Sequence, residues 1–350
     1  MTSPIIVTGG AGFIGSALVR RLIGESGGSV TNIDVLTYAG NLNSLDAITA
    51  SPSYSFEQVD IRDMASLRKI FAQYEPQTVL HLAAESHVDR SIDGPAAFVD
   101  TNVVGTYSLL EVAREYWYAA GRPRGFRFIH ASTDEVFGTL GDTGCFDETT
   151  PYAPNSPYAA SKAAADHLVR AWYKTYELPV ITTICSNNYG PYQFPEKLIP
   201  HMIITALEGD PMPVYGDGHQ KRDWLHVDDH VDALLTIMQR GRIGDVYAVG
   251  GRNEWSNIAV VEAICSALDV MRPRLDGRNY GGQITHVPDR PGHDRRYAID
   301  PSKIEQELGW RSTRSMEAGL MDTVQWYLDH ESWWRPIRKE AYGGQQLGLR

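Results

Sequence analysis

The sequence predicts an α/β fold, a doubly wound parallel sheet followed by a smaller C-terminal lobe. Short, β-rich apolar segments alternate with helical segments through the first half of the 350-residue chain. This alternation is typical of a parallel sheet covered by helices on both faces. A glycine-rich loop joins the first strand to the first helix. Beyond Cys185 the alternation ends, and prolines and aromatic residues cluster in 187–200 and 210–224.

Strands and helices follow one another in order before this change of pattern. The expected strands are Ile5–Thr8, Val30–Asp34, Ser55–Val59, Thr78–Leu82, Phe126–Ala131 and Val180–Cys185. The expected helices, several of which repeat apolar residues at three- and four-residue spacing, are Phe13–Ile23, Met64–Gln73, Ala96–Ala119 and Pro157–Tyr176.

The change near residue 186 divides the chain into two expected lobes. Residues 1–185 form the sheet domain, and the chain returns to it near 224–249. The smaller lobe comprises 186–223 and 250–337. Residues 338–350 are polar and glycine-rich, so we expect them to form a flexible tail.

The composition argues against several kinds of partner. The net charge is −11, and no basic patch is interleaved with aromatic residues, so nucleic acid is not an expected ligand. Three widely spaced cysteines fit reduced thiols better than disulfides. No segment has the features of a secretory signal, and no apolar run approaches the ~20 residues needed to cross a bilayer. We therefore expect a soluble cytoplasmic protein.

The loop Thr8–Gly15 carries the first sign of function. Gly9, Gly12 and Gly15 allow a tight turn, close approach of the backbone to a pyrophosphate and close helix–strand packing. Asp34 ends the second strand about 20 residues further on, where an acid binds a ribose hydroxyl. No arginine adjoins it, which favours NAD over NADP, because a 2′-phosphate would face a like charge. The pattern predicts a Rossmann dinucleotide site, with a purely structural glycine turn as the alternative.

Two further strand ends extend this cofactor site. Asp60 and Ile61 follow the third strand, where they would reach the adenine. Leu82–Ser86 ends the fourth strand and would pass under the nicotinamide.

Tyr158 and Lys162 stand four residues apart on a predicted helix, so they face the same way. Pro157 suits the first turn of that helix. A nearby ammonium and a positive nicotinamide would lower the pKa of the phenol, as a base near neutrality requires. The spacing is common by chance. Together with the cofactor loop and with Ser132–Thr133 at the end of the preceding strand, the spacing indicates that Tyr158 and Lys162 form a redox pair.

Taken together, these features resemble the short-chain dehydrogenase/reductase family in its extended form, which acts on nucleotide sugars. Within it the chain is similar to the dTDP-glucose 4,6-dehydratases. The similarity runs from about Ile5 to Trp326 and is carried by Ser132–Gly138, Ser186–Pro200, Tyr215–Gly218, Arg222–Trp224 and Asp289–His293.

The resemblance implies an NAD-dependent hydro-lyase that forms a 4-keto-6-deoxy sugar for deoxysugar biosynthesis, such as rhamnose formation, without net use of the cofactor. It also implies a homodimer in which Ala96–Ala119 and Pro157–Tyr176 pack as a bundle. Neither the base of the nucleotide nor the pathway that the product enters can be read from the chain. Open alternatives are a dehydratase or epimerase of another nucleotide sugar, UDP- or CDP-linked, and a catalytically silent dinucleotide-binding protein.

The adjacent acids Asp134 and Glu135 distinguish a dehydratase from an epimerase, since the 4-epimerases lack this pair in the strand-end motif. Once C4 of the hexose is a ketone, the C5 proton can be abstracted. Glu135 is the expected base, and a protonated Asp134 would donate to the departing 6-hydroxyl. Two acids in one site resist ionising together, which suits these roles. A solvated strand end that makes a turn or caps a helix is the alternative.

The same pair makes a geometric demand. Neighbouring strand residues point to opposite faces of a sheet. If both acids serve one hexose, the strand must end at about Thr133, whose hydroxyl would bind near O4 beside Tyr158.

The resemblance also assigns binding residues by position. For NAD they are Gly9, Gly12, Phe13, Ile14, Gly15, Asp34, Leu36, Thr37, Asp60, Ile61, Leu82, Ala83, Ala84, Ser86, Thr101, Tyr158, Lys162 and Asn188. For the nucleotide sugar they are Ser86, Thr133, Asn187, Lys197, Leu198, Pro213, Tyr215, Arg222, Asn257, Asp289, Arg290 and His293. Arginines suit this end because they grip diphosphate oxygens bidentately.

His226 and His230 have residue types and a spacing that suggest a metal site. A third ligand is not evident, and Asp228 or Asp229 fits the first turn of a helix. We therefore expect no metal.

Overall fold

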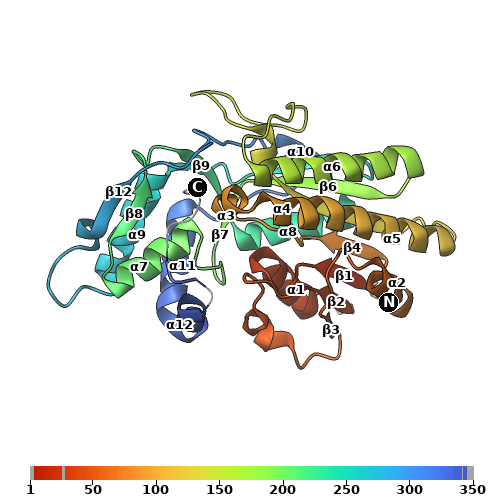
Figure 1. Ribbon diagram of the computed structural model, residues 1–350, viewed down its shortest axis with the longest axis horizontal. Coiled ribbons are helices and arrows are strands. Elements are labelled where there is room, and N and C mark those ends of the chain that lie inside the picture. The colour runs from red at the N-terminus through yellow and green to blue at the C-terminus, as the bar shows by residue number, and fades with distance from the viewer. Residues whose placement is uncertain (1–3, 26–27, 341, 345–350) are drawn as a thin grey trace.

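The computed structural model describes residues 4–25, 28–340 and 342–344. Its centre is a seven-stranded sheet (Figure 1) of β1 (Ile5–Thr8), β2 (Val30–Ile33), β3 (Tyr54–Glu57), β4 (Thr78–His81), β5 (Arg127–Thr133), β6 (Val180–Cys185) and β10 (Val246–Val249). The strand order is β10-β6-β5-β4-β1-β2-β3, and every neighbouring pair is parallel. The order reverses between β1 and β4, and ligands of such sheets bind beyond the strand ends at this point.

Helices cover both faces of the sheet. One face shares an apolar core with α1 (Phe13–Glu25), α8 (Val227–Arg240) and α10 (Ser302–Leu308). The other shares a core with α2 (Met64–Tyr74), α5 (Thr106–Ala119) and α6 (Pro157–Tyr176). The doubly wound parallel fold that the sequence predicts is therefore confirmed. Shorter elements between them are η1 (Leu42–Ile48), α3 (Val88–Asp93) and the 3-10 turn η3 (Asp134–Phe137).

The predicted helix Ala96–Ala119 consists of three consecutive segments: α4 (Pro95–Phe98), the π-helical η2 (Val99–Gly105) and then α5. In η2, the buried Asn102 side chain bonds the N–H and C=O of Glu85 at 2.8 and 3.0 Å and donates to the Ser161 hydroxyl at 2.8 Å. Single π-helical turns are frequent at functional sites. Here the turn fixes the loop after β4 against α6.

The later elements, grouped at one end of Figure 1, enclose an apolar core of their own. Its strands are β7 (Asn187–Tyr189), β9 (Lys221–His226) and β11 (Glu254–Ser256) in one sheet, and β8 (Met212–Tyr215) and β12 (Ile284–Val287) in another. Its helices are α7 (Leu198–Glu208), α9 (Asn257–Met271), α11 (Met316–Asp329) and α12 (Glu331–Glu340), with a 3-10 turn η4 (Tyr280–Gln283).

The prediction of a flexible tail over 338–350 is wrong for the residues that the structure describes in this range. Arg338 lies in α12 and pairs with Glu208 at 3.0 Å. Tyr342 is buried. The apolar face of α12, with Trp334 fully buried, docks this end of the chain on the second core. Residues 341 and 345–350 lie outside the described part of the chain.

In the described residues, no helix has both the length and the apolar content that a membrane span requires.

Candidate active site

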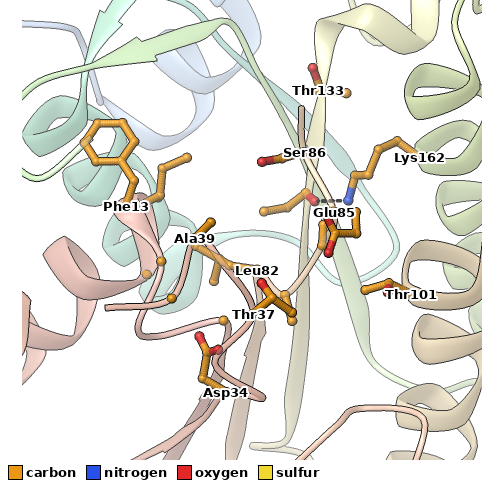
Figure 2. Close-up of a pocket in the computed structure, with 18 of the residues that line it drawn as sticks. Phe13, Asp34, Thr37, Ala39, Leu82, Glu85, Ser86, Thr101, Thr133 and Lys162 are labelled. Carbon is orange, nitrogen blue, oxygen red and sulfur yellow. Dashed lines mark hydrogen bonds between the residues drawn. The ribbon is translucent and has the colours of Figure 1, made fainter. Parts of the chain in front are cut away.

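A cavity of about 630 Å³ opens above the carboxyl ends of the parallel strands. A second cavity of about 190 Å³ adjoins it, towards the second core. The residues that line both are Ser86, Glu135, Asn187 and Lys197. Figure 2 shows Asp34 and Thr37 at one end of the first cavity and Thr133 and Lys162 at the other. The first cavity therefore has room for an elongated ligand that reaches from Asp34 to the end of β5, where the second cavity begins.

The glycine loop needs its glycines at two positions. Gly9 has a φ of +73°, and a Cβ there would lie 2.7 Å from the backbone of Ala83. At Gly15 a Cβ would lie 2.0 Å from the Gly9 carbonyl oxygen, because α1 starts directly against the loop. The backbone therefore borders the cavity without side chains, as close approach to a pyrophosphate requires.

Asp34 is anchored to this loop. Its Oδ2 accepts the N–H of Ala11 and its Oδ1 accepts the N–H of Leu36, both at 2.9 Å. Burial raises the pKa of Asp34, and these two backbone hydrogen bonds oppose the rise. The carboxylate thus stands at the end of β2 in a fixed orientation, suited to a pair of ribose hydroxyls.

Seventeen of the residues assigned to the cofactor by position line the first cavity: Gly9, Gly12, Phe13, Ile14, Gly15, Asp34, Thr37, Asp60, Ile61, Leu82, Ala83, Ala84, Ser86, Thr101, Tyr158, Lys162 and Asn188. Leu36 does not; its contribution is the N–H that holds Asp34. Asn188 receives a hydrogen bond at its Oδ1 from the Nδ1 of buried His230, at 2.9 Å. The donors and the bare backbone fit a dinucleotide.

The redox pair lies at the far end of this cavity. Ser156 caps α6 by accepting the N–H of Ala159, so Tyr158 and Lys162 sit in its first turns, both buried. Lys162 Nζ donates to the Ala131 carbonyl at 2.7 Å, the dashed line in Figure 2. Burial, and then the charge of Glu135, raises the pKa of Tyr158 well above its usual value. The protein groups alone therefore do not give the lowered phenol pKa expected from the sequence; a cation beside the phenol is needed.

The strand that carries the acid pair ends where the sequence argument requires. β5 stops at Thr133, and η3 starts at Asp134. Thr133 caps this turn, its Oγ1 accepting the N–H of Glu135 at 3.4 Å. In this turn the side chains no longer alternate between the two faces of the sheet, so Asp134 and Glu135 need not point in opposite directions.

Their surroundings differ. Glu135 lines both cavities, whereas Asp134 lines neither and is 1 % exposed. Burial, followed by the charges of Glu135 and Asp223, raises the pKa of Asp134 well above its usual value. Burial also raises the pKa of Glu135, but Arg290, Arg222 and Lys197 oppose it. Asp134 is thus set to hold a proton and Glu135 to lose one.

Asp134 should make the fold less stable at alkaline pH. The pKa of Asp134 is higher in the folded protein than in the unfolded chain. Its stabilising contribution is therefore complete at pH values below the pKa of the unfolded state, and it is lost as the pH rises through the pKa of the folded state. We expect the melting temperature of Asp134→Asn to lie a few degrees above that of the parent at about pH 8 and to equal it at about pH 4. The measurement is thermal unfolding against pH, with exposed Asp46→Asn as the control. A variant that melts lower at both pH values would contradict this account.

Most of the residues expected to hold the nucleotide line the second cavity: Ser86, Asn187, Lys197, Leu198, Pro213, Tyr215, Arg222, Asn257, Arg290 and His293. Thr133 lines only the first. Asp289 lines neither; it accepts a hydrogen bond from His293 Nδ1 at 2.6 Å and so orients that ring. Arg222 lies 4.2 Å over the ring of Tyr297 and donates to the Asp294 carbonyl at 3.0 Å.

Sequence reasoning missed Asp89, in α3. Its carboxylate accepts hydrogen bonds from Arg290 Nη1 at 2.5 Å and from the Tyr215 hydroxyl at 3.2 Å, and it lines the second cavity. The available signal was an acid in the segment that directly follows Ser86, the last residue assigned at this strand end.

The two histidines considered for a metal have other partners. His226 accepts the N–H of Asp228 and caps α8, and His230 bonds Asn188. Among the residues that the structure describes, no group of three or more His, Cys, Asp or Glu side chains could hold a metal ion.

Comparison with known proteins settles the family. A model of the GDP-mannose 4,6 dehydratase family matches residues 6–323. The chain is 56 % identical over 349 residues to a dTDP-glucose 4,6-dehydratase of Neisseria meningitidis, covering 98 % of each chain. The identity is also 56 % over 349 residues with that of Salmonella typhimurium, covering 97 % of this chain and 96 % of the other. The chain belongs to the dTDP-glucose 4,6-dehydratase family.

Solved structures agree with this family. The chain is similar to a dTDP-glucose 4,6-dehydratase of Bacillus anthracis in complex with NAD, at 46 % identity and a TM-score of 0.86, covering 96 % of this chain and 99 % of the other. The dTDP-glucose 4,6-dehydratase of Streptomyces venezuelae, with NAD and TYD bound, is 42 % identical with a TM-score of 0.88, covering 95 % of this chain and 99 % of the other. A UDP-glucose 4-epimerase of Thermotoga maritima is 29 % identical with a TM-score of 0.82, covering 93 % of this chain and 99 % of the other. Like its dehydratase relatives, this family member is NAD-dependent.

Proposed function

We infer that the protein is an NAD-dependent hydro-lyase that converts dTDP-glucose into dTDP-4-keto-6-deoxy-glucose. One observation carries this inference beyond family membership. Glu135 lies where the two cavities meet, with the buried Asp134 next to it in the chain. A hexose at that junction would have the cofactor cavity on one side and the diphosphate-binding arginines on the other.

The residues of the chain divide the proton transfers between them. NAD, when bound, supplies oxidation at C4 of the sugar and the return of the same hydride to C6. Tyr158 takes the proton of the 4-hydroxyl, and Thr133 holds the same oxygen. In addition to the buried Lys162 ammonium, the phenolate needs a further cation, which would be the positive nicotinamide of bound NAD.

Loss of water then needs both acids. The ketone at C4 acidifies the C5 proton, and Glu135 removes it, its anion favoured by the nearby Arg290, Arg222 and Lys197. Glu135 gives a proton back to C5 when the hydride reaches C6. Asp134, kept neutral by burial, delivers a proton to the departing 6-hydroxyl. Because Asp134 lies behind the cavity wall, we infer that its carboxyl reaches the sugar by a side-chain rotation, or that the Thr133 hydroxyl, 3.4 Å from its Oδ1, relays the proton.

The nucleotide is the part of this proposal that a substrate panel tests. We expect kcat/KM to be about tenfold or more higher for dTDP-glucose than for UDP-glucose or CDP-glucose, since pocket contacts to a methyl group discriminate by this order. The panel, completed by GDP-mannose, is measured by formation of the keto product. Equal or better turnover of UDP-glucose would assign the enzyme to another nucleotide sugar.

We also propose a homodimer in the cytoplasm. Three exposed apolar side chains lie in η2 and at the start of α5: Val99, Val104 and Tyr107. A bundle of α5 and α6 from two protomers would cover them. The free cysteines fit a reducing compartment.

A further inference from the structure

Asp166 is a buried carboxylate that the mechanism above does not use. It is 4 % exposed and accepts three hydrogen bonds. Ser132 Oγ donates at 2.6 Å, the Tyr152 hydroxyl at 2.9 Å, and His130 Nε2 at 2.9 Å. The two carboxylate oxygens of Asp166 can accept all three of these hydrogen bonds at once.

The network joins the two elements that carry the catalytic groups. His130 and Ser132 lie on the same face of β5, two residues apart, and both bond Asp166. The carbonyl of Ala131 between them accepts from Lys162. Asp166 is four residues beyond Lys162, on the same face of α6. Three consecutive residues of β5 are therefore bound to one turn of α6.

Tyr152 extends the network to the acid pair. Its hydroxyl bonds Asp166, and its ring packs edge-on against Phe137 of η3, with centroids 5.4 Å apart. The carboxylate thus supports the strand end, the turn that carries Glu135 and the helix that carries Tyr158.

The charges around Lys162 point to a single counter-ion. Burial lowers the pKa of Lys162, and Asp166 is the first group that opposes this. His81 of β4 and His130 of β5 also face this region; their pKa values are lowered by burial, so both rings are neutral near pH 7. Cys185 of β6 is a neutral thiol, its pKa raised to about 12 by burial. Tyr158, on α6 itself, has a raised pKa through burial. Among the described groups that act on Lys162, Asp166 is the carboxylate that favours the ammonium form.

We propose that Asp166 is a positioning residue of the dehydratase, which keeps Lys162 in its ammonium form and holds β5 against α6 beside Tyr158. The proposal rests on the proposed function for its kinetic consequence, but the electrostatic coupling of Asp166 and Lys162, which lie four residues apart on α6, does not. Neither role requires contact between Asp166 and a ligand, and Asp166 lines neither cavity.

The first test is the pH profile of kcat/KM for dTDP-glucose with Asp166→Asn, which keeps the shape and removes the charge. We expect the alkaline limb to move down by about one pH unit, because the lysine then loses its proton more readily. Ser132→Ala and Tyr152→Phe each remove one hydrogen bond and keep the charge, so their alkaline limbs should stay in place. An Asp166→Asn profile that falls uniformly, with its limbs unmoved, would overturn the proposal.

Asp229→Asn is the matched structural control. Asp229 is 2 % exposed, accepts hydrogen bonds from Ser312, Thr313 and Arg314, and lines neither cavity. We expect it to lower the melting temperature without moving either limb. An alkaline shift equal to that of Asp166→Asn would mean that general loosening, and not the charge at Asp166, moves the limb, and would overturn the proposal.

A stability cycle tests the pairing without turnover. Lys162→Met leaves a buried anion without its counter-ion, and Lys162→Met/Asp166→Asn removes both charges. The double variant should melt higher than Lys162→Met; a double variant that melts at or below Lys162→Met would overturn the electrostatic coupling. The cycle does not depend on Asp166→Asn folding alone. Failure of the parent enzyme to turn over dTDP-glucose would refute the proposed function and leave this result standing.

Discussion

Glu135→Gln is expected to lower turnover of dTDP-glucose roughly 100- to 10,000-fold, the range over which a general base contributes. Oxidation at C4 should survive, because Tyr158 and Lys162 are untouched. The absorbance of the reduced cofactor should therefore rise when substrate is added and should not decay. The elimination of water is the step that stops, since the amide cannot take up the C5 proton.

The control is Glu148→Gln, which alters a half-buried glutamate that accepts the N–H of Ala248 and lines neither cavity. Its turnover should stay close to that of the parent. If Glu135→Gln lost oxidation at C4 and water loss to the same extent, its role as the C5 base would be wrong.

Tyr158→Phe should produce a loss of similar size with the opposite signature. Without the phenol no group of the chain takes the 4-hydroxyl proton, so C4 is not oxidised and the absorbance of the reduced cofactor should not rise. We expect a fall of about 1,000-fold in kcat, within the general-base range, with the cofactor content of the purified protein unchanged.

Tyr74→Phe is the matched control, because the Tyr74 hydroxyl bonds Glu57 and neither side chain lines a cavity. It should leave kcat unaltered. Rapid formation of reduced cofactor in Tyr158→Phe would contradict the assignment and would direct attention to Thr133 and bound water.

The parts of the site that the sequence predicts well are those set by local chain geometry. There is no room for a Cβ at Gly9 or Gly15. A glycine pattern of this kind, with a strand before it and a helix after it, predicts a dinucleotide-binding loop. The demand that β5 end at Thr133 followed from the alternation of strand side chains alone, and the turn at Asp134 meets it. The family likeness added the nucleotide end, where no local rule applies.

What the sequence could not supply depends on contacts between distant segments. Asp89 and Arg290 are 201 positions apart, and only the folded chain shows that one orients the other. Asp134 is buried behind the cavity wall, and this burial makes its pKa differ from that of Glu135. The burial also depends on contacts between distant segments. Leu36 and Asp289 were assigned to ligands by position, but each acts on a neighbouring side chain.

We infer that one hydride leaves C4 and returns to C6 of the same sugar while Glu135 and Asp134 remove water. The most direct measurement uses dTDP-glucose carrying deuterium at C4, without added reductant, and determines the label in the product by mass spectrometry and NMR. We expect a 4-keto-6-deoxy product with the deuterium at C6 of the same molecule. Deuterium released into solvent, or no product at all, would contradict it.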